Sequence, residues 1–146
     1  MKNSRNQLKA YSFLVLLFAA FSLIKLTVEL IVIGFDKEIA ALDVSPELVL
    51  AVTIIFFVLS LILLLPQIYV GVRGLKIAKN PEAKKGHIVW AVILLAVSVF
   101  AIFTPILDIT ANVNVVGNVV TLIDYALDIV VYCMYIKYAN RVLKGI

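Results

Sequence analysis

The sequence contains a single cysteine, Cys133, and a single histidine, His87. One cysteine cannot form an internal disulfide, and it cannot build a thiolate-cluster metal site. The apolar pattern places His87 in a connecting loop, so the apolar segments offer no histidine-based catalytic triad or metal centre. We therefore expect no cofactor and no bound metal. Because no nucleophile and base are spaced for catalysis, we also expect that the protein is not an enzyme.

Charged residues are scarce as well. They make up 15% of the 146 residues, whereas hydrophobic residues make up 64%. Soluble domains typically contain about 25% charged and about 45–50% apolar residues, so a soluble fold would leave much of this apolar surface in water. The composition therefore predicts an integral membrane protein.

Four long apolar runs indicate where the chain crosses a bilayer. A hydrocarbon core about 30 Å thick requires about 20 apolar residues in a helix that rises about 1.5 Å per residue. The runs occupy residues 11–35, 48–72, 88–110 and 118–138, and a basic loop, 73–87, follows the second of them. We predict an all-α fold in which residues 1–146 form a single membrane domain, a bundle of four transmembrane helices.

The distribution of lysine and arginine predicts the orientation of these helices. Eleven of the 13 basic residues lie in three groups, which four crossings place on the same side. The groups are Lys2, Arg5 and Lys9, then Arg73, Lys76, Lys79, Lys84 and Lys85, then Lys137, Arg141 and Lys144. Short basic loops stay on the cytoplasmic side, so we expect both termini in the cytoplasm and a location in a bacterial cytoplasmic membrane. Topology then explains the net charge of +4, and we expect the lipid bilayer, not nucleic acid, as the partner.

Charged residues inside the apolar runs gather at similar depths. At about 1.5 Å per residue, Glu29 and Asp124 lie about 7–9 Å from the outer ends of their helices. Lys25 and Asp128 lie about 13–15 Å deep by the same count, and Asp108 lies nearer the outer surface. We call these five residues the outer cluster. Its formal charge is −3 if every member is ionised, so its charges cannot all be paired internally.

The charge imbalance leaves two interpretations open. Burial favours the neutral form of a carboxyl group, and so does a like-charged neighbour one helical turn away, as for Asp124 and Asp128. The unpaired acids would then hold protons, bind a cation or face a water-filled vestibule, and ionisable groups inside a membrane are typical of functional sites. Alternatively, Lys25 and Asp128 form a structural clasp between two helices while the shallower acids are hydrated.

Small and polar residues share one stripe of the second run. The stripe consists of Thr53, Ser60, Gln67, Gly71 and Gly74. Small residues let helices approach closely in a membrane, and polar side chains form hydrogen bonds between helices, so we expect this stripe to face protein. Pro66 lies beside Gln67 and cannot donate a backbone hydrogen bond, which predicts a kink or hinge in the inner part of this helix.

Two segments resemble the PQ-loop families, which include the SWEET and SemiSWEET sugar transporters. The segment LPQIY, 65–69, lies before the basic loop in a helix that runs from outside to inside, where those families carry their Pro-Gln motif. The segment NVVT, 118–121, resembles the part of their third helix that carries a substrate-contacting asparagine. The resemblance implies a hinge at Pro66 and Gln67, a substrate contact at Asn118, and a dimer that completes the transport path.

A third segment, GVRGLKIAKNP at 71–81, resembles small, uncharacterised four-span membrane proteins of bacteria. This second resemblance covers more of the chain but implies no activity.

The sequence leaves two functional hypotheses. The first is a proton- or cation-coupled solute carrier in which Asp124 and Asp128 take up the ion, Lys25 tunes their affinity, and Pro66 with Gln67 forms a hinge. The second is a non-catalytic accessory, interaction or immunity-type membrane protein whose charged cluster is a structural clasp. Four helices joined by short loops enclose little space, so we expect a homo-oligomer or a subunit of a membrane complex in either case.

Overall fold

The computed structural model describes residues 2–32 and 45–146, apart from the side chains of residues 29–32, 46, 49, 53 and 56. The helices of the described part are α1 Lys2–Val32, α3 Pro46–Lys79, α4 Gly86–Ala101, α5 Phe103–Thr110 and α6 Val115–Leu143. Four stretches of this part are long and apolar enough to cross a membrane, with α4 and α5 together making one of them. The prediction of an all-α, four-helix membrane bundle is confirmed, and the protein is an integral membrane protein.

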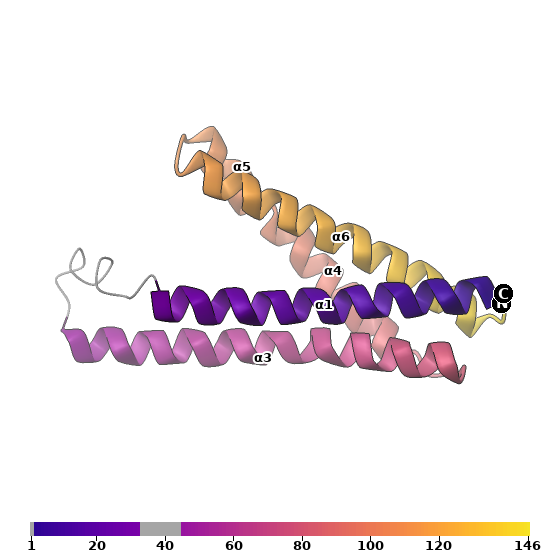
Figure 1. Ribbon diagram of the computed structural model, residues 1–146. Helices are drawn as coiled ribbons and strands as arrows, with labels where there is room; N and C mark the ends of the chain where they lie inside the picture. Colours follow the sequence, from indigo (N-terminus) through magenta and orange to yellow (C-terminus); the bar gives the residue numbers. More distant parts are fainter. Residues whose placement is uncertain (1, 33–44) are drawn as a thin grey trace.

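The helices form two hairpins that meet at one end and diverge toward the other (Figure 1). Helices α1 and α3 run side by side along their length, while α4 and α5 pair with α6. Contacts between α1 and α6, and between α3 and α4, join the hairpins. We call the meeting end the basic end, because the three groups of basic residues lie there, at the start of α1, at the end of α3 with the loop 80–85, and at the end of α6. The opposite end, where the hairpins are separate, is the open end.

The buried core lies toward the basic end and draws on all four membrane-spanning stretches. Its apolar members are Leu8, Val15 and Ala19 of α1, Val70, Ile77 and Ala78 of α3, Ile88 and Ala91 of α4, and Val131, Tyr132, Tyr135, Ala139 and Val142 of α6. Large apolar side chains such as Leu50, Phe100 and Val116 are exposed, as expected where a helix faces lipid. The bundle is therefore packed at the basic end and unpacked at the open end.

Close helix contacts in the core depend on small residues of α3. A Cβ atom added to Gly71 would lie 2.5 Å from Leu16 Cγ, and one added to Gly74 would meet Ser12 Oγ and lie 2.6 Å from Tyr135 Cε2. The side chains of Ser12 from α1 and Tyr135 from α6 therefore pack directly against Gly74 of α3, where no larger residue fits. Gln67 of the same stripe is 8% exposed. This part of the stripe faces protein, as its composition predicts for a membrane helix.

The loop between α3 and α4 is shorter than predicted. Helix α3 continues to Lys79, so the loop spans only 80–85 and not 73–87. Arg5 of α1 explains the extension, because its Nε donates to the Ala78 carbonyl at 2.7 Å and its Nη2 donates to the Lys79 carbonyl. Carbonyl groups at a helix end have no partner within the helix, and a guanidinium that binds them also offsets the negative end of the helix dipole.

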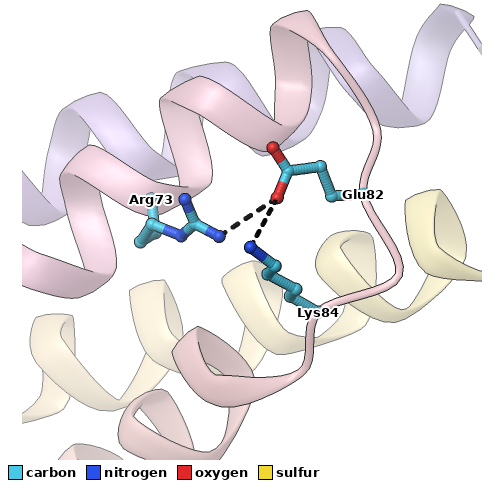
Figure 2. Close-up of polar contacts among 3 residues, drawn as sticks. All are labelled: Arg73, Glu82 and Lys84. Carbon is cyan, nitrogen blue, oxygen red and sulfur yellow. Dashed lines mark hydrogen bonds and ion pairs between the residues drawn. The ribbon is translucent and has the colours of Figure 1, made fainter.

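Within the loop, Glu82 joins two basic residues (Figure 2). Its Oε2 lies 3.2 Å from Arg73 Nη2 and 3.7 Å from Lys84 Nζ. Among the described side chains, these are the ion pairs of the protein. They cross the short turn from α3 to α4 and thus restrain it.

Replacing Arg5 by alanine is expected to destabilise the bundle. Hydrogen bonds that involve a charged group contribute about 1.5–3 kcal/mol, so we expect the free energy of unfolding to fall by about 2 kcal/mol. Lys9→Ala is the matched control, since Lys9 is an exposed basic residue of the same helix. Denaturant titration in detergent micelles measures both variants. Equal effects of the two substitutions would show that Arg5 does not stabilise the end of α3.

The helix break lies in a different place from the predicted hinge. Pro66 is inside α3, which is continuous, whereas the third membrane span is divided at Ile102 into α4 and α5. Pro105 follows the break, and a proline leaves the carbonyl four residues before it, that of Ala101, without its helical donor. Pro66 thus lies within a continuous helix, where the hinge stays a prediction, and the third span carries an interruption.

Candidate functional site

A chamber of about 230 Å³ is lined by α1 and α6, one helix from each hairpin. Its lining consists of Ser22, Lys25 and Leu26 from α1, and Thr121, Asp124, Tyr125 and Asp128 from α6. Three residues of the outer cluster thus share one chamber. Spacings of three and four residues place the α1 lining on one face of its helix and the α6 lining on one face of the other, which explains how the sequence builds the site.

The chamber charges are not paired with one another. Both ion pairs among the described side chains involve Glu82, so none joins Lys25 to Asp124 or Asp128. Helix α6 begins at Val115, earlier than predicted, which places Asp128 about 20 Å along it at about 1.5 Å per residue. Asp128 therefore lies near the middle of its helix, deeper than the sequence predicted. Asp124 is exposed and Asp128 is half-buried.

The remaining predicted site residues are not in the chamber. Asp108 lies on α5 outside the lining, and its backbone carbonyl accepts a hydrogen bond from the Val113 amide at 2.9 Å. Asn118 Nδ2 donates to the Val113 carbonyl at 2.8 Å, so this amide stabilises the turn between α5 and α6. The side chain of Glu29 lies outside the described residues. Of the five residues of the outer cluster, the described part of the structure brings three into the chamber: Lys25, Asp124 and Asp128.

Two polar side chains are buried in the core near the chamber residues. Tyr132 of α6 lies one helical turn from Asp128 and is 3% exposed, and Gln67 of α3 is 8% exposed. Neither Pro66 nor Gln67 lines the chamber. The two candidate hinge residues therefore lie outside the chamber.

One helical turn beyond Tyr132, Tyr135 forms a buried polar contact with His87 of α4. His87 is 1% exposed and Tyr135 is 0% exposed. The Tyr135 hydroxyl donates to the Val70 carbonyl at 3.0 Å, so its oxygen accepts a hydrogen bond from His87 Nδ1 at 2.6 Å. This pattern assigns the Nδ1–H tautomer to a neutral His87. The rings of His87 and Tyr135 also contact edge to face. Because the Tyr135 hydroxyl of α6 bonds to His87 of α4 and to the Val70 carbonyl of α3, three helices meet around it.

The sequence prediction for His87 is therefore wrong. His87 belongs to the first turn of α4 and is part of the core, not of the basic loop. Tyr135 was detectable in principle, because it continues the α6 stripe of Asp124, Asp128 and Tyr132 by a further three residues. Nothing in the local sequence around His87 indicates its partner, which is 48 residues away.

Within residues 2–32 and 45–146, no group of three or more His, Cys, Asp or Glu side chains is arranged to hold a metal ion. Cys133 is a free, exposed cysteine on α6. The chamber therefore offers a lysine ammonium, two carboxyl groups and three hydroxyl groups as its polar chemistry.

Comparison with known proteins gives no identification: no family model, no curated protein and no solved structure matches the chain.

Proposed function

We propose that the protein is a small carrier that moves a solute across the membrane together with a proton or another cation. The observation that carries this proposal is the chamber, in which Lys25, Asp124 and Asp128 meet without an ion pair. Asp124 and Asp128 are the residues that take up the ion in this proposal. Lys25 adjusts their affinity through its positive charge.

The free-energy cost of placing charged side chains in a membrane supports this assignment. A charged side chain at the centre of a membrane helix costs about 2.5–3.5 kcal/mol, so such residues are rare unless they act on an ion or a substrate. One lysine and two aspartates give the chamber a formal charge of −1. One bound proton or monovalent cation makes it neutral. The chamber is therefore suited to alternate between an occupied, neutral state and an empty, charged state.

The shape of the bundle also supports a carrier. Its two hairpins are separate at the open end and packed together at the basic end, and we propose that the chamber opens toward the open end. Carriers alternate between states that open to opposite sides, largely by rocking one group of helices against another. The two hairpins are natural units for such a motion. The interruption at Ile102, before Pro105, is where the third span can bend.

The test is charge movement in liposomes that contain the purified protein. Currents are recorded after jumps of pH, Na⁺ or K⁺ for the wild type, Asp124→Asn and Asp128→Asn. We expect a current in the wild type and its loss in both variants, which keep the shape of the side chain but lose its charge. Asp108→Asn is the matched control, because Asp108 lies outside the chamber, and its current should equal that of the wild type. Absence of wild-type current under every gradient would reject the carrier.

A double substitution distinguishes the carrier from an accessory protein with a structural clasp. In a clasp, Lys25→Leu and Asp128→Asn together destabilise less than either alone, because an unpaired buried charge is worse than none. Since no ion pair joins these residues, we expect the double variant to be no more stable than either single variant. Thermal unfolding in detergent measures all three variants. A double variant that is more stable than either single variant would support the clasp instead.

The proposal includes an orientation and an assembly state. We place the basic end in the cytoplasm of a bacterial cell, which puts both termini inside and the chamber open to the outside. We also propose a homo-oligomer, because apolar side chains of both hairpins are exposed at the open end and a second copy would complete the wall of the path.

A further inference from the structure

The basic end carries far more positive than negative charge. Among the described side chains, Glu82 is the one acid at this end, and it pairs with Arg73 and Lys84. Arg5 donates to the carbonyl groups at the end of α3. The other basic side chains of this end are exposed, namely Lys2, Lys9, Lys76, Lys79, Lys85, Lys137, Arg141 and Lys144. The described part of the protein therefore offers no further side-chain acid to balance these exposed cations.

Two tyrosines from different helices form an aromatic surface beside two of these cations. The rings of Tyr11 from α1 and Tyr138 from α6 stack with their centroids 5.7 Å apart and their planes 10° from parallel. Lys137 Nζ lies 5.5 Å from the centroid of the Tyr138 ring, within the range of a cation–π contact. Arg141 follows Lys137 by four residues, so both cations lie on one face of α6. We call Tyr11, Lys137, Tyr138 and Arg141 the tyrosine platform.

We propose that the tyrosine platform binds the headgroup of an anionic phospholipid. Its two cations complement the negative phosphate, and the guanidinium of Arg141 can bind two phosphate oxygens at once. The hydroxyl groups of Tyr11 and Tyr138 have no hydrogen-bond partner among the described residues, so both can donate to phosphate or glycerol oxygens. Lys137 is already held over an aromatic ring, which lowers the entropy cost of ordering its side chain on binding.

Apolar residues continue the platform toward the open end. On α1, Leu14 and Phe18 follow Tyr11 on the same helix face, and both are half-buried against the core. On α6, Val130 lies two turns before Lys137 and is 57% exposed. Because α1 and α6 run in opposite directions, these apolar residues all lie on the bilayer side of the platform. Charged and hydroxyl groups are thus followed by apolar groups, in the order in which the headgroup of a phospholipid is followed by its acyl chains.

A lipid suits the platform better than a soluble anion. Tyrosine rings concentrate at the membrane–water interface, where the headgroups lie. Clusters of lysine and arginine next to a membrane span attract anionic headgroups. A soluble phosphate would meet the same charges but none of the apolar residues. Lipid binding here is independent of the proposed carrier, because no residue of the platform lines the chamber.

A lipid bound to the platform joins the two hairpins. Tyr11 belongs to the hairpin of α1 and α3, whereas Lys137, Tyr138 and Arg141 belong to the hairpin that contains α6. A ligand that binds the folded state but not the unfolded state raises the temperature of unfolding. Binding of an anionic phospholipid therefore stabilises the packed basic end.

The test compares thermal unfolding in nanodiscs of phosphatidylcholine with unfolding in nanodiscs that also contain phosphatidylglycerol, an anionic phospholipid. We expect phosphatidylglycerol to raise the unfolding temperature of the wild type by about 5 °C, as for a ligand well above its dissociation constant. The double variant Lys137→Gln with Arg141→Gln should lose most of this rise. The matched control is Lys76→Gln with Lys79→Gln, which removes two exposed lysines of α3 at the same end and should keep the rise.

A rise that is lost in the platform variant and kept in the control supports the site. No rise in the wild type would overturn it, and so would equal rises or equal losses in the two double variants, because the overall charge would then set the response. A rise of the same size when inorganic phosphate is added to phosphatidylcholine nanodiscs would identify a soluble anion instead of a lipid. If the platform variant does not fold in phosphatidylcholine, Arg141→Gln decides, with Lys79→Gln as its control.

Discussion

Replacing Tyr135 by alanine is expected to cost the protein about 3–5 kcal/mol of unfolding free energy, the range for aromatic residues removed from a core. Tyr135 is the largest fully buried side chain. Its loss opens a cavity between three helices and also leaves His87 without its partner. The expected result is a bundle that loses cooperative thermal unfolding, measured by circular dichroism in detergent.

Two controls separate packing from hydrogen bonding at this position. Tyr135→Phe keeps the ring but removes the hydrogen bonds to His87 and Val70, so it should cost about 1–3 kcal/mol. Tyr69→Ala removes a tyrosine that is 41% exposed and should cost less than about 1 kcal/mol. If Tyr135→Ala and Tyr69→Ala were equally stable, the core at the basic end would not hold the hairpins together.

Replacing Gly74 by leucine is the second substitution with a large expected effect. Even a Cβ atom at this position meets Ser12 Oγ and lies 2.6 Å from Tyr135, so a leucine cannot fit unless α1 or α6 moves. Overpacking of this kind typically costs about 1–3 kcal/mol, and occasionally more. We expect failure to purify as a monodisperse species, measured by size-exclusion chromatography.

Gly86→Ala is the control for Gly74. A Cβ atom at Gly86 lies 3.2 Å from the Tyr69 hydroxyl, which is the end of an exposed side chain and can move. This variant should remain folded, because alanine also favours a helix over glycine by about 1 kcal/mol. A folded Gly74→Leu variant with wild-type stability would contradict the close helix contact.

Sequence patterns predicted the elements of the fold that depend on local composition. Apolar runs of about 20 residues identify membrane spans because the bilayer sets their length. The i, i+3 and i+4 spacing on α1 and α6 correctly grouped Lys25, Asp124 and Asp128 on facing stripes, and the structure brings these three into one chamber. These features need no knowledge of how the helices pair.

The features that sequence patterns missed all depend on contacts between distant residues. The end of α3 depends on Arg5, which is 73 residues from Ala78. The buried contact between His87 and Tyr135 joins residues that are 48 positions apart, and no periodicity within one helix reports it. Pro66 and Pro105 are both prolines in apolar runs, yet only Pro105 follows an interruption, at Ile102, and local composition does not distinguish the two.

The most direct test of the central claim asks from which side the chamber is open. Cys133→Ser provides a cysteine-free background, and Ser22→Cys then places one thiol in the chamber lining. Membrane vesicles of known orientation are treated with a membrane-impermeant maleimide from either side. We expect labelling from the side opposite the termini, and protection from the side of the termini. Labelling from the side of the termini, or from neither side, would contradict a chamber that opens away from the basic end.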